Sequence, residues 1–362
     1  MAVCLLAVGT IGYADTINIK ADGSGEYPTI QAAIDNANEE DTIILQTGTY
    51  TGNGNRDIDF NGKAITVRST DPNNPEIVAN TVIDCSGSEG DYHRGFIFQS
   101  GEDTNSILAG VTVTNSYAQE GGGILCRRSS PHIKHCLITR NVAEYYGGGL
   151  YFEESSEGLV TDCQIIENRS EDDGGGVFTV GSGSAPQFIR CLIVGNSAND
   201  NGAGIRCDDY SSPLLKNCII AENTAADEGG GVACKWESSA EVINCTISNN
   251  SALVGGGLYC KESEMSVMNS ILWENTANKG PEIAMELKDE PSLPSTISVA
   301  FTAVQGGPND AYVDTTCDLD WQAGNIQNDP LFDDTAGDYH LPSVAGRWDP
   351  NSRIWVNDFN TS

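Results

Sequence analysis

One short pattern recurs six times between residues 115 and 280 of this 362-residue chain. Each unit contains a glycine cluster, an apolar strand, a polar corner, a second apolar strand with a cysteine, and an asparagine. The clusters begin at Gly121, Gly147, Gly174, Gly202, Gly229 and Gly255, so the repeat length is 26 to 28 residues. A repeat this regular indicates a stack of similar units, each of which buries its apolar face against its neighbours.

The apolar positions of each unit alternate with variable positions, which is the periodicity of β-strands. An isoleucine follows two residues after each repeated cysteine, and the residue between them varies from leucine to glutamine to threonine. These cysteines are Cys136, Cys163, Cys191, Cys218 and Cys245. The pattern predicts an all-β fold, a single-stranded parallel β-helix (a solenoid) with coils of about 27 residues that stack about 4.8 Å apart.

Asparagines keep the same spacing as the glycine clusters, at Asn115, Asn141, Asn168, Asn196, Asn223, Asn250 and Asn275. In stacked coils we expect their side-chain amides to bond from coil to coil, with Asn141, Asn168, Asn196, Asn223 and Asn250 forming a structural ladder. Asparagine also tolerates the left-handed backbone that a sharp corner needs.

The pattern Asn-x-Ala-x-x-x-Gly-Gly-Gly, found at residues 223–231, resembles the right-handed parallel β-helix of the pectate-lyase-like superfamily. It is particularly similar to the repeats of polymorphic outer-membrane proteins. The resemblance extends over roughly residues 20 to 310 and implies a secreted protein. It implies architecture more than activity, because this fold carries lyases, hydrolases, esterases and adhesins alike.

The chain divides into four regions by its pattern. Residues 1–14, with an apolar run from Val3 to Ile11, are expected to be a signal peptide, although a buried first strand is the alternative. Residues 15–114 should hold the first coils and an N-terminal capping helix, with Thr29 as N-cap and an apolar stripe of Ile30, Ala33, Ile34 and Ala37. Residues 115–280 are the regular repeats, and residues 281–362 are expected to form irregular last coils and a truncated C-terminal segment.

Acidic residues outnumber basic residues by 51 to 19, which gives a net charge of −32. This charge argues against nucleic acid or an anionic membrane surface as a partner. Outside the first residues no apolar run reaches the length of a membrane span. We therefore expect a secreted or cell-surface protein, monomeric, whose partner is a polysaccharide or a cell-surface glycan.

The repeated cysteines fall on inward positions of the strands. We expect buried free thiols that pack as small apolar groups, with disulfides between coils as the alternative.

The variable column of the glycine strand is rich in aromatic residues and is expected to face solvent. Tyr151, Phe178, Arg206 and Tyr259 occupy it, and Trp236 lies at its edge. Exposed rings at coil spacing could stack on successive sugars, so these five are the predicted substrate-binding residues. The alternative is packing between coils that stiffens the sheet.

A group of basic residues interrupts the acidic pattern, and Arg127, Arg128 and His132 in it are candidate catalytic residues. The resemblance to lyases implies Ca²⁺ held by carboxylates, for which the candidates are Glu153, Glu154, Asp208 and Asp209. For the basic group, the alternative is a series of salt bridges from Arg127 and Arg128 to Glu153 and Glu154 in the next coil. For the carboxylates, the alternative is a solvated acidic face that Lys235 and Lys261 partly neutralise.

Two functions agree with these observations. The first is a non-catalytic scaffold that binds glycans or surface partners through a rigid sheet face. The second is a Ca²⁺-dependent lyase, or another carbohydrate-active enzyme, that acts on a uronate-containing polysaccharide. The signature residues of pectin methylesterases and polygalacturonases are not found, and the coils vary little in length, which favours the scaffold.

Overall fold

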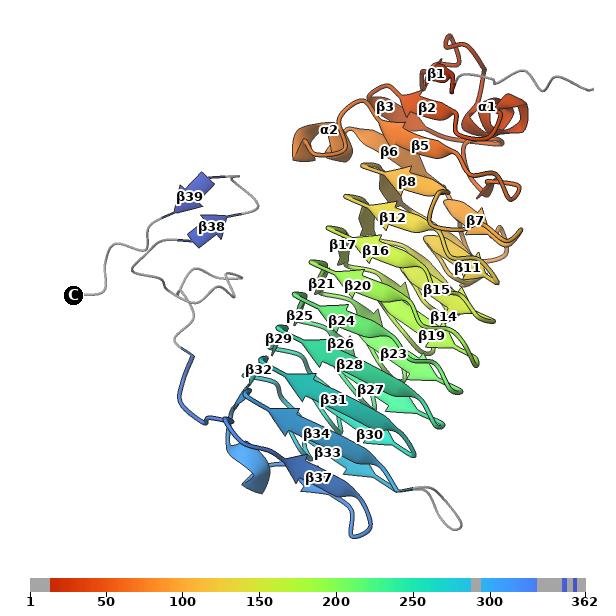
Figure 1. The fold of residues 1–362 in the computed structure, drawn as a ribbon. Coiled ribbons are helices and arrows are strands. Elements are labelled where there is room, and N and C mark those ends of the chain that lie inside the picture. The colour runs from red at the N-terminus through yellow and green to blue at the C-terminus, as the bar shows by residue number, and fades with distance from the viewer. Residues whose placement is uncertain (1–13, 288–293, 331–346, 350–353, 357–362) are drawn as a thin grey trace, which may run out of the picture.

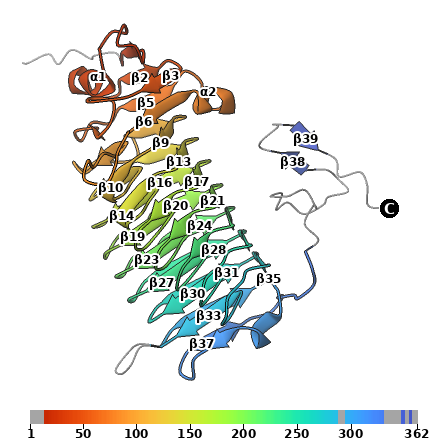
Figure 2. The same cartoon turned by 180° about the vertical axis from the view of Figure 1, so that it is seen from behind.

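The protein is an elongated stack of coils that runs from the N-terminal helix α1 to the last strands of the solenoid (Figures 1 and 2). This computed structural model describes residues 14–287, 294–330, 347–349 and 354–356. Each coil contributes one strand to each of three long parallel sheets, so the single-stranded parallel β-helix expected from the repeat is confirmed.

Sheet A has twelve strands in stacking order. They are β1 (Thr16–Ile19), β2 (Thr42–Leu45), β5 (Thr66–Ser69), β8 (Ile107–Ala109), β12 (His132–Lys134), β16 (Leu159–Thr161), β20 (Gln187–Ile189), β24 (Leu214–Lys216), β28 (Ser239–Ile243), β31 (Glu264–Met268), β34 (Thr296–Ala300) and β37 (Asp318–Trp321).

Sheets B and C have ten strands each. Sheet B contains β3 (Gly48–Tyr50), β6 (Thr81–Asp84), β9 (Thr112–Thr114), β13 (Leu137–Thr139), β17 (Gln164–Ile166), β21 (Leu192–Val194), β25 (Ile219–Ala221), β29 (Thr246–Ser248), β32 (Ile271–Trp273) and β35 (Ala303–Val304). Sheet C contains β4 (Ile58–Asp59), β7 (Phe96–Phe98), β11 (Ile124–Arg127), β15 (Leu150–Glu153), β19 (Val177–Val180), β23 (Ile205–Asp208), β27 (Val232–Lys235), β30 (Leu258–Lys261), β33 (Ile283–Glu286) and β36 (Tyr312–Val313).

A fourth parallel sheet, sheet D, has five short strands between the asparagine corner and the glycine cluster. These are β10 (Tyr117–Glu120), β14 (Val142–Tyr146), β18 (Arg169–Ser170), β22 (Ser197–Ala198) and β26 (Thr224–Ala225). The sequence pattern did not separate this sheet from the corners.

The helices are short, and none in the described part of the chain has the length and apolar character to cross a membrane. They are α1 (Ile30–Asn36), α2 (Pro75–Ala79) and the 3-10 turn η1 (Gly307–Asn309). The predicted N-cap of α1 is confirmed, because Thr29 Oγ1 accepts the Ala32 N–H at 3.2 Å and the predicted apolar stripe is buried. That α1 closes the N-terminal end of the stack stays a prediction.

The core consists of the inward columns of sheets A, B and C. Equivalent residues lie opposite one another in the strand register, as in Ile138, Ile165 and Ile193, all of which are fully buried. The repeated cysteines are buried and free, so the thiol expectation is confirmed. The Sγ atom of Cys218 also accepts the Cys191 backbone N–H of the preceding coil at 3.4 Å.

The predicted asparagine ladder is confirmed and extends to Asn275. The Nδ2 group of each asparagine donates to Oδ1 of the next, at 3.0 Å from Asn168 to Asn196 and from Asn196 to Asn223. The ladder ends on a carboxylate, because Asn275 Nδ2 donates to Glu282 Oε2 at 2.5 Å.

Two details of this corner differ from the expectation. Asn115 is not in the ladder, because Thr114 pairs with Thr139 and Ser116 therefore takes the position below Asn141. The left-handed residue is not the ladder asparagine but the one before it, such as Arg140 at φ 56° and Glu167 at φ 55°.

The glycine cluster lets the chain turn from sheet D into sheet C. Gly147 has φ 68°, and a Cβ there would lie 2.5 Å from the carbonyl oxygen of Leu150. A Cβ on Gly148 would lie 2.5 Å from the carbonyl oxygen of Gly175 in the next coil. Larger residues would therefore push neighbouring coils apart.

The coils continue beyond residue 280, where the sequence pattern becomes irregular, and sheet A runs on to Trp321. Strands β38 (Arg347–Asp349) and β39 (Ile354–Val356) form an antiparallel pair. The expected signal peptide and most of the expected C-terminal segment after residue 330 lie outside the described residues.

Candidate functional site

The predicted column of sheet C points away from the main core but is buried, so the prediction that it forms an exposed sugar-binding column is wrong. Tyr151 and Phe178 are each 3% exposed, Arg206 is 2% exposed and Tyr259 is fully buried. The physical cause is the chain turn from sheet D, which places the first glycine of each cluster on this column. A Cβ on Gly174, for example, would lie 2.7 Å from Phe178 Cβ.

The aromatic members of this column form a second, smaller core between sheets C and D. The rings of Tyr151 and Phe178 stack with centroids 5.6 Å apart, and Tyr146 of β14 lies over Phe178 at 4.8 Å. Packing between coils, the alternative to sugar binding, is what the structure shows at these positions.

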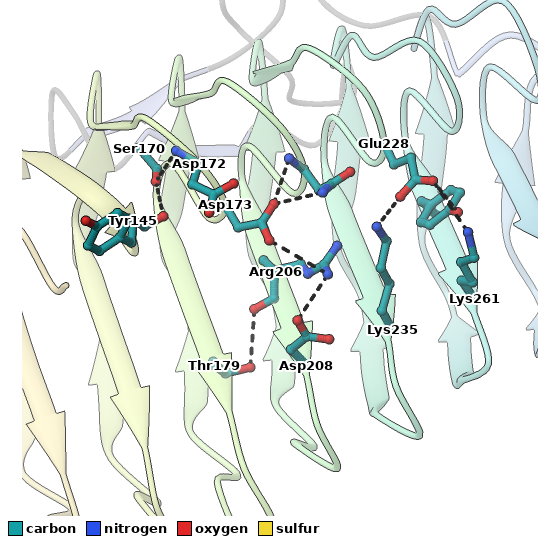
Figure 3. A network of polar contacts seen from close by, with 12 residues as sticks. Tyr145, Ser170, Asp172, Asp173, Thr179, Arg206, Asp208, Glu228, Lys235 and Lys261 are labelled. Atoms are coloured by element: carbon teal, nitrogen blue, oxygen red, sulfur yellow. Dashed lines mark hydrogen bonds and ion pairs between the residues drawn. The ribbon is translucent and has the colours of Figure 1, made fainter. Parts of the chain in front are cut away.

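Charged groups continue the same buried column toward the C-terminal coils (Figure 3). Arg206 Nη2 lies 3.1 Å from Asp208 Oδ2 and 3.9 Å from Asp173 Oδ2. Burial raises the pKa of Asp208 to about 6, and the charge of Arg206 only partly offsets this effect. Asp208 is therefore an internal partner of Arg206 rather than a solvent-facing ligand.

Glu228 is the centre of the next part of this network (Figure 3). It pairs with Lys235 of β27, lies 3.9 Å from Lys261 Nζ, and accepts a hydrogen bond from the Tyr259 hydroxyl at 2.7 Å. Lys235 and Lys261 thus neutralise a carboxylate, as the alternative to a metal site anticipated, but Glu228 is only 8% exposed and does not belong to a solvated face.

The three candidate catalytic residues are held by coil-to-coil contacts. Arg127 Nε lies 2.6 Å from Glu153 Oε2, and Arg128 Nε lies 2.9 Å from Glu154 Oε2. His132 Nε2 lies 3.0 Å from Thr161 Oγ1, and burial lowers the pKa of His132. The salt-bridge explanation of the basic group is therefore the one that the structure supports.

The predicted metal ligands do not come together as one site. Glu153 and Asp208 are both opposite Val180 in the register, so they lie two coils apart, about 10 Å along the stack. Glu153 and Glu154 are engaged by arginines, and Asp209 is exposed at a corner.

A different acidic group does meet at the end of sheet D. Ligand oxygens of Asp172, Asp173 and Asp200 lie within 4.8 Å of one another. Burial and neighbouring carboxylates raise the pKa values of Asp172 and Asp200. Within the described ranges this is the set of side chains best placed to hold a hard cation.

Four tyrosines, two exposed and two half-buried, form an aromatic surface at the N-terminal end of sheet D, which we call the tyrosine cluster: Tyr92, Tyr117, Tyr145 and Tyr146. Tyr92 is 41% exposed and stacks on Tyr117 with ring centroids 5.9 Å apart and an interplanar angle of 22°. Tyr145 is 42% exposed, and its ring centroid lies 6.3 Å from that of Tyr146.

Backbone pairing positions the rings of this cluster. Tyr117 begins β10, pairs with Val142 of β14, and forms an antiparallel bridge with His93 in the loop that carries Tyr92. The imidazole of His93 is fixed by Asp57, with Nδ1 2.6 Å from Asp57 Oδ2. The loop is therefore tied both to sheet D and to the preceding coil.

Carboxylates border the tyrosine cluster. Glu144 Oε2 accepts a hydrogen bond from the Tyr92 hydroxyl at 2.6 Å, and this contact raises the pKa of Tyr92 to about 12. Burial raises the pKa of Tyr117, and the negative charges of Glu171, Glu89 and Glu144 raise it further. Aromatic faces with acidic rims are thus accessible to solvent here.

Two further surfaces have fewer exposed aromatic side chains than the tyrosine cluster. Trp236 is half-buried at the corner after β27, next to a single exposed pair in which the Tyr210 hydroxyl donates to Glu237 Oε1 at 2.8 Å. A groove of about 330 Å³ on sheet A has a mixed lining, with apolar side chains such as Leu214 and Met265 beside Glu241 and Glu264.

The predicted site residues included none of the four tyrosines of the cluster and none of Asp172, Asp173 and Asp200. Tyr92 lies in a loop outside the repeat, so no column of equivalent residues identified it. Tyr117 lies in the segment between the asparagine corner and the glycine cluster, and Tyr145 and Tyr146 lie in the equivalent segment of the next coil. This shared location of three tyrosines is the sequence signal that could have identified the cluster.

Part of the chain matches one protein family, and two solved structures match most of its length. Residues 103–279 match the family described as "Periplasmic copper-binding protein (NosD)". The pectate lyase Pel9A matches with a TM-score of 0.54 and 14% identity over 89% of this chain and 84% of that chain. The receptor-binding tailspike of bacteriophage Det7 matches with a TM-score of 0.20 and 11% identity over 90% of this chain and 78% of that one. No curated protein sequence matches the chain.

The likeness to the pectate lyase shows the fold. The chain has the right-handed parallel β-helix fold that the resemblance of its repeats implied.

Proposed function

We propose that this protein is an exported scaffold, extracellular or periplasmic, that binds a glycan on the tyrosine cluster and does not cleave it. The observation that carries the proposal is the exposed pair of rings at Tyr92 and Tyr145, each backed by a second tyrosine. Sugar rings have apolar faces that stack on aromatic side chains, and the phenol hydroxyls and nearby carboxylates can bond to sugar hydroxyls.

Rigidity favours binding by this surface. Tyr92 is stacked on Tyr117 and bonded to Glu144, so the ring loses little conformational freedom when a ligand covers it. The predicted column on sheet C has no comparable role, because Tyr151, Phe178 and Tyr259 are buried.

The state of the basic residues supports a non-catalytic role. A lyase needs a base with access to the substrate beside its bound metal. Arg127 and Arg128 are ion-paired between coils. Arg206 is the arginine closest to the aspartate group, but it is 2% exposed and bonded to Asp208.

We propose Ca²⁺ rather than copper as the cation that this chain could hold. Asp172, Asp173 and Asp200 offer only carboxylate oxygens, which are ligands for Ca²⁺. Copper sites in proteins use histidine, cysteine and methionine. The cysteines of the described repeats are buried in the core and are not available to a metal at the surface. The three aspartates therefore fit Ca²⁺ better than copper, the metal that the family description names.

The test is a binding and cleavage panel. The protein is incubated with neutral, amino and uronate polysaccharides, with and without Ca²⁺, while binding is measured by calorimetry and unsaturated uronate products by ultraviolet absorbance. We expect binding without product, and weaker binding by Tyr92→Ala. Product formation would establish the lyase alternative, and absence of binding to every glycan would refute the proposal.

A further inference from the structure

We propose that the tyrosine cluster selects sugars that carry a free amine, such as oligomers of glucosamine, over uronates and over their neutral N-acetylated forms. This inference rests on the proposed glycan-binding function and specifies the chemical class of the ligand. It follows from which charges border the exposed rings and where they lie.

The charge around the cluster is negative on several sides. Glu144 contacts the Tyr92 hydroxyl, while Glu171 and Glu89 lie close enough to raise the pKa of Tyr117. The cationic groups near the cluster are already paired, because Arg169 Nη2 lies 3.5 Å from Glu171 and His93 lies between Asp57 and Asp91. A uronate would bring a carboxylate into this field, whereas an ammonium group would be attracted to it.

The position of the Glu144 carboxylate adds a geometric requirement. It lies 2.6 Å from the Tyr92 hydroxyl, at the rim of the ring and not over its face. A ligand that covers the ring and satisfies the carboxylate must therefore have an apolar face with a cation at its edge. An amino sugar has this arrangement, because its amine is attached directly to the pyranose ring.

The same arrangement disfavours a basic peptide. A lysine side chain has a long flexible stem, and fixing it costs conformational entropy that a rigid pyranose ring does not lose. Cations also interact favourably with the faces of tyrosine rings, which strengthens binding of an ammonium group beside Tyr92 or Tyr145.

The experiment compares ligands of equal length, and its central pair, the amine and acetylated forms of one oligomer, also shares a backbone. Calorimetry with the full chain at low and physiological salt uses glucosamine oligomers, the matching N-acetylglucosamine oligomers, galacturonate oligomers and oligolysine. We expect the amine form to bind roughly tenfold more tightly than the acetylated form, with a preference that falls as salt increases.

The outcomes separate the inference from the proposed function. If the acetylated oligomers bind as tightly as the amine form, glycan binding stands and amine selection is refuted. If no glycan binds, the proposed function itself fails. If oligolysine binds as tightly as the glucosamine oligomers, the site responds to charge alone and the inference is overturned.

Variants locate the site. Glu144→Gln should remove most of the preference for the amine but leave binding of the acetylated oligomer, whereas Tyr92→Ala should weaken both by roughly fivefold. The matched control is Tyr210→Ala, because Tyr210 is exposed and bonded to Glu237 as Tyr92 is to Glu144. An equal loss of binding in Tyr210→Ala, or an unchanged preference in Glu144→Gln, would refute the assignment. Thermal unfolding of each variant checks that it is folded.

Discussion

Replacing Glu282 by glutamine should make the stability of the protein less dependent on pH, so that the variant gains stability relative to the wild type as the pH rises. Glu282 is 5% exposed and accepts the Nδ2 and backbone N–H groups of Asn275 at 2.5 and 3.2 Å. Among the described residues it has no ion-pair partner, and burial raises its pKa from 4.5 to about 7. The negative charge of the neighbouring Glu274 adds to this effect.

The sign and size of the effect follow from proton linkage. A raised folded-state pKa contributes stability that is complete below the unfolded value of 4.5 and is lost as the pH rises through about 7. One pKa unit corresponds to about 1.4 kcal/mol, so the difference of about 2.5 is worth about 3 kcal/mol in total. About 2 kcal/mol of this should be lost between pH 5.5 and pH 8.5.

The assay is urea unfolding of the wild type and of Glu282→Gln, monitored by circular dichroism at several pH values between 5.5 and 8.5. This range avoids the isoelectric point of about 4.1. The stability of the variant relative to the wild type should increase across the range by about 2 kcal/mol. A constant offset introduced by the glutamine amide does not affect this slope.

Glu274→Gln is the control, because Glu274 is an exposed carboxylate one residue before Asn275. Its pH-dependent effect should stay within about 0.5 kcal/mol. A difference between wild type and Glu282→Gln that is flat with pH would refute the reasoning. It would mean that the carboxylate at the end of the ladder is hydrated or compensated in the folded chain.

Other predictions concern the core, the ladder and the acidic group. Ile193→Ala should cost about 2 to 5 kcal/mol of unfolding free energy in urea because it leaves a cavity in a fully buried column, and a cost near zero would contradict the inward assignment. Asn196→Ala should cost about 2 kcal/mol or more, because it leaves Asn168 Nδ2 and its backbone N–H without their shared acceptor, and hydrogen exchange should increase in both adjacent coils. Ca²⁺ should raise the melting temperature, Asp172→Asn should reduce that increase, and equal Ca²⁺ effects in wild type and variant would exclude this group as the site.

The inward columns and the asparagine ladder were predictable because they repeat. Ile138, Ile165 and Ile193 occupy one position of successive coils, and a stack requires that such positions coincide. Asn115 shows that sequence spacing alone can be wrong by one residue. The strand register places Ser116, and not Asn115, beside Asn141.

The burial of the sheet C column was not predictable from alternation alone. Alternation tells which side chains leave the core, but not whether another part of the chain covers them. The segment before each glycine cluster folds onto Tyr151 and Phe178 because Gly147 and Gly174 adopt positive φ. The tyrosine cluster escaped prediction for a related reason, since Tyr92 reaches Tyr117 from a loop that has no equivalent in other coils.

The ladder also bears on how such a chain can change in length. Every amide from Asn141 to Asn275 donates in the same direction and accepts from the coil before it, so each inner step is interchangeable with the next. Duplicating or deleting one inner coil would leave every ladder amide with an acceptor, provided that the final acceptor, Glu282, is kept. The ladder therefore sets no particular number of coils, and it is coil-specific contacts such as those of Arg127 with Glu153 and of Arg206 with Asp173 that distinguish one winding from the next.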